Sequence, residues 1–155
     1  MKGGLMHSQL SEAALLARQA AEALNAQFAW LIDHRDGDGV ADLFTADGVY
    51  DMSDHVYSGR SAIAEFYAVR KARGRRTARH VFTNLRLELE QPSLARAVSI
   101  LTLYAYDGAP PYPAHPIMIS DYQDVLVREA DGIWRYCSRT IVPVFGVLPM
   151  LRKPA

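Results

Sequence analysis

A histidine and an aspartate are the residues of this sequence best suited to proton transfer. His80 opens a run in which apolar residues alternate, and Asp33 stands at the end of a helical apolar stripe. A neutral imidazole can accept a proton, and a neighbouring carboxylate can hold the ring and stabilise the imidazolium. A carboxylate at a helix C-terminus faces the negative end of the helix dipole, and a residue placed against local preference favours a functional interpretation. The alternatives are a solvated Asp33 and a structural His80.

Arg139 is a third candidate for chemistry. It lies in a strand-like apolar run, between Ser138 and Thr140. A charged side chain on an apolar strand face needs a partner. Arg139 could hold an anionic leaving group or an enolate, and the alternative is an edge-strand arginine in water.

Polar residues also interrupt the apolar face of another predicted strand. Asp121 and Gln123 share one side of the run 117–128 with three aliphatic residues, because alternate residues of a strand point to the same face. The pattern favours a substrate-binding pocket lining, with a structural hydrogen-bonded pair as the alternative. Tyr50, on the first short strand, could also reach the pocket mouth.

A run of basic residues crosses the end of a predicted helix and the loop after it. Its members are Arg70, Lys71, Arg73, Arg75, Arg76 and Arg79. Cations suit a helix C-terminus, so a solvated face is one interpretation and an anion or phosphate site is the other. The run lacks interleaved aromatic residues, and the formal net charge of the chain is zero, so nucleic acid is not an expected partner.

Several other chemistries lack their signatures. The sequence has no glycine-rich nucleotide loop and no metalloprotease motif, and its five histidines lack metal-ligand spacing, so neither a cofactor nor a metal is expected. The single cysteine, Cys137, excludes an internal disulfide and predicts a buried structural thiol in a cytoplasmic protein. No apolar run approaches the roughly 20 residues of a membrane-spanning helix.

The N-terminal half is expected to be helical. A first helix over 11–32 carries an apolar stripe that includes Leu24 and Phe28. Asp38 can cap a short second helix that ends near Phe44, and a third helix opens at 59–61 and ends at Gly74. The other predicted members of the stripe are Leu16, Ala20 and Leu31.

The C-terminal half is expected to be strands. After a short strand at 49–52, long strands are predicted over 80–90, 96–106, 117–128 and 133–144, with a proline-rich loop at 108–116. Helices followed by a meander of strands indicate an α+β domain. Long strands twist and curl, so the concave face leaves room for a pocket beneath the helices. The 155 residues form a single domain, with 1–10 expected to be frayed.

Three stretches carry a resemblance to a known family. The runs RHVFTNLRLE at 79–88, IDHRDG at 32–37 and DGIWRY at 131–136 resemble the SnoaL-like group of the NTF2-like superfamily. Within that group the chain is similar to lindane dehydrochlorinase and, less closely, to scytalone dehydratase. The resemblance implies an NTF2-like cone, in which a strongly curved, mixed or antiparallel sheet is closed by about three N-terminal helices around one pocket.

The resemblance also implies roles for individual residues. His80 would be the base, Asp33 would orient it, and Arg139 would stabilise developing negative charge. Phe28 stands where the dehydrochlorinase has a lysine, so it would contact substrate as an apolar group. Near Asp121 and Gln123 the scytalone dehydratase has a serine and an asparagine.

One conflict concerns the direction in which His80 points. It has the strand parity of Arg86 and Glu88, opposite to Leu85 and Leu87. For His80 to face the pocket, the sheet must bend or bulge, or the apolar side must pack on another subunit. A second packed face, together with the two-sided apolar run 96–106, predicts a dimer or trimer.

Two classes of function follow. The first is a cofactor-independent lyase or isomerase, similar to a dehydratase, that acts on a small, largely apolar cyclic molecule. The second is a non-catalytic ligand-binding or subunit-scaffold protein of the same fold. A hydrogen bond between Asp33 and His80 within a pocket would favour the enzyme.

Overall fold

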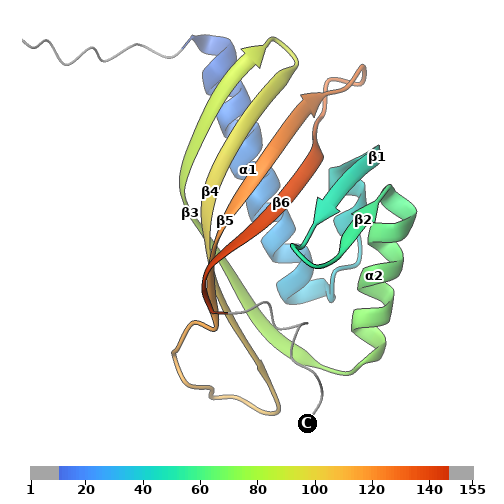
Figure 1. The fold of residues 1–155 in the computed structure, drawn as a ribbon, viewed down its shortest axis with the longest axis vertical. Coiled ribbons are helices and arrows are strands. Elements are labelled where there is room, and N and C mark those ends of the chain that lie inside the picture. Colours follow the sequence, from blue (N-terminus) through green and yellow to red (C-terminus); the bar gives the residue numbers. More distant parts are fainter. Residues whose placement is uncertain (1–10, 147–155) are drawn as a thin grey trace, which may run out of the picture.

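The computed structural model describes residues 11–146, and the predicted frayed segment 1–10 lies outside them (Figure 1). In chain order the elements are helix α1 (Glu12–Arg35), a short 3-10 helix (Val40–Leu43), strands β1 (Phe44–Asp51) and β2 (Val56–Ser58), helix α2 (Arg60–Ala72), and strands β3 (Arg76–Gln91), β4 (Leu94–Asp107), β5 (Met118–Arg128) and β6 (Trp134–Gly146). The fold is α+β, as predicted.

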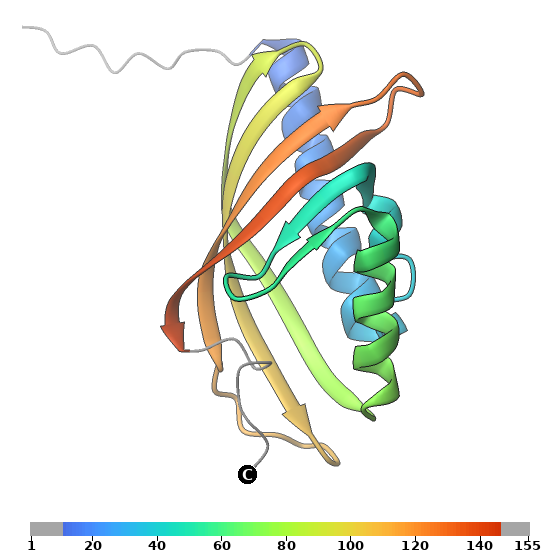
Figure 2. The same ribbon diagram turned by 45° about the vertical axis from the view of Figure 1, so that its right-hand side comes forward.

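The described strands form one curved, mixed sheet. Their order is β2-β1-β6-β5-β4-β3, and every neighbouring pair is antiparallel except β1 and β6, which run parallel. The sheet curls around α1, and α2 lies beside the short strands β1 and β2 (Figures 1 and 2). The curvature therefore brings the ends of both helices toward one end of the concave face.

Two expectations about this architecture are corrected. Residues 11–146 hold two α-helices rather than three, and the sheet is open, with β2 and β3 at its edges. The expected second helix is the four-residue 3-10 helix Val40–Leu43, because β1 already begins at Phe44 and leaves no room for a second helical turn. The sequence also gave no sign of the three-residue strand β2.

Helix α1 packs on the sheet along a stripe that differs in part from the expected one. The Ser11 side chain accepts a hydrogen bond from the Ala14 N–H at 3.2 Å and so caps the helix. The buried stripe is Ala17, Ala21, Leu24, Asn25, Phe28 and Ile32. Leu16 is instead 57% exposed. Alanines on the buried side allow the helix backbone to approach the strands closely, which places the larger leucines toward solvent.

A bulge in β3 settles the direction of His80. The register with β4 shifts between Thr83 and Arg86, and Asn84 lies there with a φ of 54°. Asparagine tolerates this left-handed conformation better than most residues. Before the bulge the side chains of Ala78, His80 and Phe82 face the concave side, and after it the leucines do. One inserted residue thus turns both the histidine and the leucine run inward.

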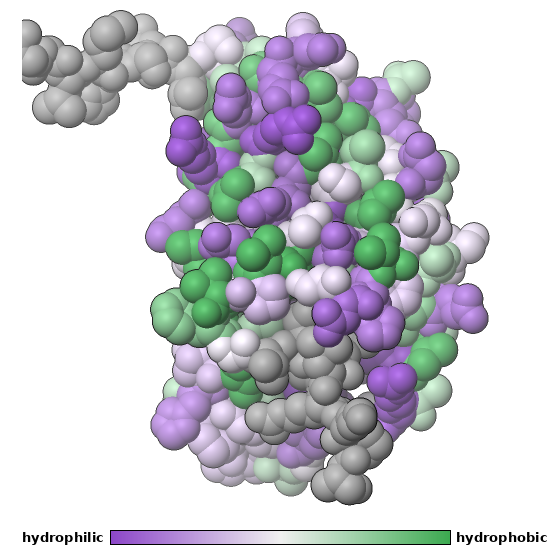
Figure 3. Space-filling view, viewed as in Figure 1, coloured by the Kyte–Doolittle hydropathy of each residue, from purple (hydrophilic) through white to green (hydrophobic). Residues whose placement is uncertain are grey.

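The convex face of the sheet carries apolar side chains that no described helix covers. Val81, Val98 and Val142 are 43%, 41% and 38% exposed on β3, β4 and β6. Figure 3 shows this side of the molecule, where hydrophobic side chains are interspersed with hydrophilic ones. The face is therefore mixed rather than wholly polar.

Phe28 lies at the centre of the core, so its removal is expected to cost much stability. The ring is fully buried and meets the rings of Tyr50, Tyr122 and Tyr136 edge-on. Phe28→Ala should lower the free energy of unfolding by about 3–5 kcal/mol, measured by urea denaturation. Leu16→Ala, on the exposed side of the same helix, should change it by less than about 0.5 kcal/mol. Equal effects of the two variants would contradict this packing.

Candidate active site

Asp33 and His80 form a buried hydrogen-bonded pair. The Nδ1 atom of His80 lies 2.6 Å from Oδ1 of Asp33, and the backbone N–H of His80 donates to Oδ2 of the same carboxylate at 2.8 Å. The side chains are only 9% and 6% exposed. Two hydrogen bonds from one residue hold both carboxylate oxygens, so the carboxylate has little freedom to rotate.

This geometry decides which nitrogen of His80 can react. An ionised Asp33 accepts a hydrogen bond, so Nδ1 carries the hydrogen and Nε2 keeps its lone pair. The structure gives Nε2 no hydrogen-bond partner among the described residues. The ring lines a cavity of about 470 Å³. A molecule in that cavity would meet His80 through the basic nitrogen.

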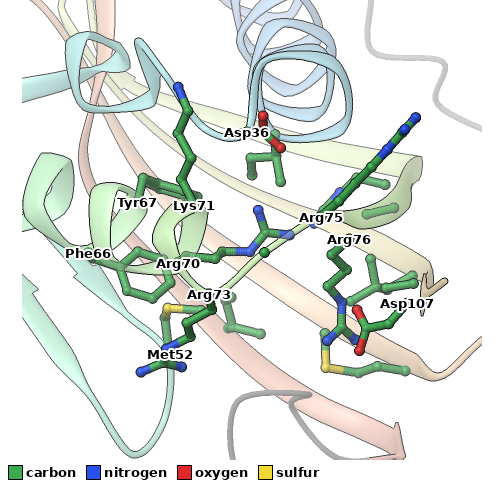
Figure 4. A pocket seen from close by; sticks show the side chains of 18 of the residues that line it. Asp36, Met52, Phe66, Tyr67, Arg70, Lys71, Arg73, Arg75, Arg76 and Asp107 are labelled. Carbon is green, nitrogen blue, oxygen red and sulfur yellow. The ribbon is translucent and has the colours of Figure 1, made fainter.

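The cavity has an apolar interior and a charged mouth. It lies between the concave face of the sheet and the facing sides of the two helices. The interior is lined by Ile32, Tyr50, Phe66, Tyr67, Ala78, His80, Leu103, Ala105, Met118, Tyr122 and Ile141. The mouth carries the arginines and the lysine at the end of α2 and in the turn after it (Figure 4). Such a site suits a small, mostly apolar molecule.

Three buried phenols stand in the cavity wall. Burial raises the pKa of Tyr50, and the hydrogen bond with Tyr67 and the charge of Arg139 offset part of the rise. Burial and the proximity of Tyr50 place the pKa of Tyr67 and of Tyr122 well above the usual range. All three therefore stay protonated at neutral pH. Tyr67 and Tyr122 are each hydrogen-bonded to Tyr50, so a hydroxyl hydrogen that these bonds do not use can be donated to an oxygen of a bound molecule.

Gly37 allows Tyr67 to take its place in the wall. The glycine has a φ of 88°, and a Cβ built there would lie 2.1 Å from Cδ1 of Tyr67. The chain leaving α1 therefore packs its bare backbone against the ring. A side chain at this position would collide with the ring as well as strain the backbone.

Arg139 lies beneath the cavity rather than in its wall. Its Nε and Nη2 atoms each donate to the Asp124 carboxylate at 2.8 Å, and Nη2 also donates to Oδ1 of Asn25. The guanidinium is fully buried over the rings of Tyr136, at 4.0 Å, and Phe28, at 4.4 Å. Burial alone would lower the pKa of Arg139, but the Asp124 charge and hydrogen bonds raise it, so the pair is ionic.

The expected role of Arg139 is corrected accordingly. The side chain does not line the cavity, and Asp124 matches its charge within the fold, so the geometry does not support the expected contact with substrate. It instead links β5, β6 and α1 below Tyr122, whose ring centroid lies 4.9 Å from the guanidinium carbon. Arg139 is a structural residue that supports the cavity floor.

Three of the residues that were expected to contact substrate do not line the cavity. Phe28 is buried in the core and does not line the cavity. Asp121 and Gln123 lie on the convex face, because the concave side of β5 carries Ser120, Tyr122 and the other alternate residues. Polar residue type therefore pointed to the wrong face of this strand. Tyr50 lines the cavity, as expected.

Sequence reasoning missed Tyr67 and Tyr122 as cavity residues. Tyr67 shares a helical face with Ile63 and Phe66, and that face predicted packing rather than a lining role. Tyr122 stands between the two polar residues that drew attention on β5. The signal available was strand parity, since the buried positions of β5 alternate with positions that are partly or fully exposed.

The described residues contain neither a cluster suited to a metal ion nor a membrane-spanning helix. Between residues 11 and 146, no group of three or more histidine, cysteine, aspartate or glutamate side chains could hold a metal ion. Over the same residues, neither helix is long and apolar enough to cross a membrane. Cys137 is free and half-buried.

The chain belongs to the family of SnoaL-like domains, which it matches over residues 13–140. Among solved structures it is similar to a variant of Rv3472 from Mycobacterium tuberculosis, a protein of unknown function, with 30% identity over 84% of this chain and 73% of that one and a TM-score of 0.68. ActVI-ORFA from Streptomyces coelicolor is 26% identical over 84% and 98% of the two chains, with a TM-score of 0.72.

A third similar structure contains a ligand. A protein from Catenulispora acidiphila, solved in complex with S-DNPA, is 28% identical over 85% of this chain and 95% of that one, with a TM-score of 0.67. No curated protein matches the chain.

The buried ion pair leads to a stability prediction. Asp124→Asn keeps the shape of the side chain but leaves the Arg139 charge unmatched, so it should lower the free energy of unfolding by about 3–5 kcal/mol in urea denaturation. Asp121→Asn on the convex face of the same strand is the matched control and should change it by less than about 0.5 kcal/mol. An Asp124→Asn variant as stable as the control would show that Arg139 does not depend on this carboxylate.

Proposed function

We propose that the protein is a lyase or isomerase that removes a proton from a small molecule, with His80 as the general base. The observation that carries the proposal is the Asp33–His80 pair, a 2.6 Å contact between two nearly buried side chains, of which His80 lines the cavity and Asp33 lies behind it. A histidine held by a carboxylate through Nδ1 is poised to accept a proton at Nε2.

The reaction follows from the groups around the cavity. Nε2 of His80 takes a proton from carbon, and the electron pair of the broken C–H bond forms a double bond with the neighbouring carbon. In a lyase reaction the double bond forms as the leaving group departs from that second carbon with the electron pair of its bond. It departs either as halide or as hydroxide, which becomes water by taking the proton that His80 has accepted. In an isomerase reaction the electrons move onto a carbonyl oxygen, and the enolate is reprotonated elsewhere.

Residues near His80 stabilise the charges that form. Asp33 stabilises the imidazolium, because its carboxylate already accepts the Nδ1 hydrogen. Tyr50, Tyr67 and Tyr122 are neutral donors that can meet a developing oxyanion. These phenols take the role first expected of Arg139.

The comparisons support a small-molecule ligand. The fold is that of SnoaL-like domains, and one similar protein holds the small molecule S-DNPA. A ligand-binding or subunit-scaffold protein has no need of a cavity-lining histidine that a buried aspartate holds through Nδ1. The pair therefore favours an enzyme over the non-catalytic alternative.

We further propose that the protein is a homo-oligomer that pairs through the convex face of the sheet. Val81, Val98 and Val142 expose apolar surface there on three strands. The location we propose is the cytoplasm, which rests on the use of a single, free cysteine.

Loss of the proposed base should remove most of the activity. Once a substrate is found among cyclic hydroxyketones, halogenated rings and polyketide-like phenols, His80→Ala should lower kcat by about 10²–10⁴-fold. Asp33→Asn should have a comparable effect, and the double variant should be little worse than either, because the residues act as a unit. Initial rates under saturating substrate give the measurement.

The control for this prediction is His55→Ala, which removes an exposed histidine outside the cavity lining and should keep the wild-type rate. Circular dichroism should show that all variants remain folded. Turnover by His80→Ala at the wild-type rate would mean that another group is the base.

The oligomer has its own test. Sedimentation velocity at micromolar concentration should show a dimer or trimer, and Val98→Lys should shift the population toward monomer by placing a charge on the convex face. Leu16→Lys, which adds the same charge on the exposed side of α1, should leave the assembly unchanged. A wild-type protein that sediments only as monomer would refute the proposal.

A further inference from the structure

The mouth of the cavity concentrates positive charge in a chain that is neutral overall. Two acidic residues in the lining, Asp36 and Asp107, are opposed by five basic ones, whereas the whole chain has a formal net charge of zero. The basic residues are Arg70, Lys71, Arg73, Arg75 and Arg76 (Figure 4). Five of the six members of the basic run noted in the sequence therefore line the cavity, and Arg79 does not.

The nearby carboxylates account for only some of these charges. Lys71 forms an ion pair with Asp38 at 2.7 Å and is exposed to solvent. Arg76 lies opposite Asp107 in the register of β3 and β4. Within residues 11–146, Arg70 and Arg73 form no ion pair.

Arg70 is the basic residue placed to meet a ligand inside the cavity. It is half-buried, follows Tyr67 by three residues on α2, and extends toward the middle of the cavity, whereas Lys71 points away (Figure 4). Its charge acts on Tyr50 and Tyr67, so it lies within electrostatic reach of the cavity interior. Arg73 lies on the same side of the mouth, near Met52 (Figure 4).

The dipole of α2 gives only part of the reason for this arrangement. Arg70 and Lys71 stand in the last turn of the helix, where cations are favoured. That effect does not explain why further cations lie beyond the helix end around the same opening. A half-buried guanidinium gains most when an anion binds to it, because charged hydrogen bonds are strong where water is scarce.

We propose that the molecule bound in this cavity carries an anionic group, a carboxylate or a phosphate, that Arg70 and Arg73 hold at the mouth. Its apolar part then lies against the tyrosines and His80. The inference rests on the proposed function only in placing the ligand in the same cavity. Anchoring one end of the molecule would fix the distance of the other end from Nε2 of His80.

The test compares three probes that share one ring system: naphthoate, naphthyl phosphate and uncharged naphthol. Isothermal titration should show tighter binding of at least one anion than of naphthol, with an affinity that falls as salt rises. Arg70→Gln and Arg73→Gln together should weaken that anion by about 10- to 100-fold and leave naphthol unchanged. The preference between the two anions distinguishes a carboxylate from a phosphate ligand.

The matched control is Arg86→Gln, which removes the same charge from an exposed position on β3 outside the cavity. It should leave all three affinities unchanged. Arg73→Gln alone changes an exposed side chain and serves if the double variant fails to fold. Naphthol binding at least as tight as that of both anions, equal losses in the control, or no binding of any anion would overturn the proposal.

The outcome is separable from that of the proposed reaction. His80→Ala removes the base and leaves the arginines, so it should keep the preference for the anion. Turnover of a neutral substrate that depends on His80 would refute the proposed anion site and support His80 as the general base. A preference for anions, together with activity that does not depend on the Asp33–His80 pair, would support the anion site and refute the proposed general base.

Discussion

The contact between Asp33 and His80 joins the end of α1 to the edge strand β3 of the curved sheet, and His80 lines the cavity at that junction. One residue donates both hydrogen bonds, from its backbone and from its ring, to the two oxygens of one carboxylate. The contact exists only because the bulge at Asn84 turns His80 toward the concave face while the leucines after it also face inward. A regular strand would place either His80 or the leucines in solvent.

A second charged pair supports the same cavity from below. Arg139 and Asp124 are buried together among aromatic rings, and Asn25 of α1 accepts a further hydrogen bond from the guanidinium. The opposite charges of Arg139 and Asp124 compensate each other inside the protein. The excess positive charge lies instead at the mouth, at the end of α2, so our proposal assigns support of the fold and recognition of a ligand to different arginines.

Much of the fold could be read from the sequence, because it depends on local patterns. Long apolar runs, alternating at 80–90 and two-sided at 96–106, predicted the long strands, and the Asp131-Gly132 turn lies between the last two. The first helix was predicted to end at Ile32, close to its observed end at Arg35. The short elements were not predicted correctly. The 3-10 helix before β1 has four residues, too few to show a helical period, and β2 has only three residues. The buried stripe of α1 differs from the predicted one because the close approach of the helix to the sheet favours alanine. A pattern based on hydrophobicity alone favours the larger leucines instead.

For the site, the sequence by itself determined the residue types of the pair, because few side chains accept protons near neutral pH and Asp33 lies in the last turn of a helix. Only the tertiary structure decided which faces point inward. Asp121 and Gln123 lie on the convex side of the sheet, and Arg139 is buried against Asp124. Tyr67, Tyr122 and Arg70 line the cavity. A bulge or a sheet's curvature reverses or redirects side chains through contacts between distant residues, and no local spacing in the sequence records them.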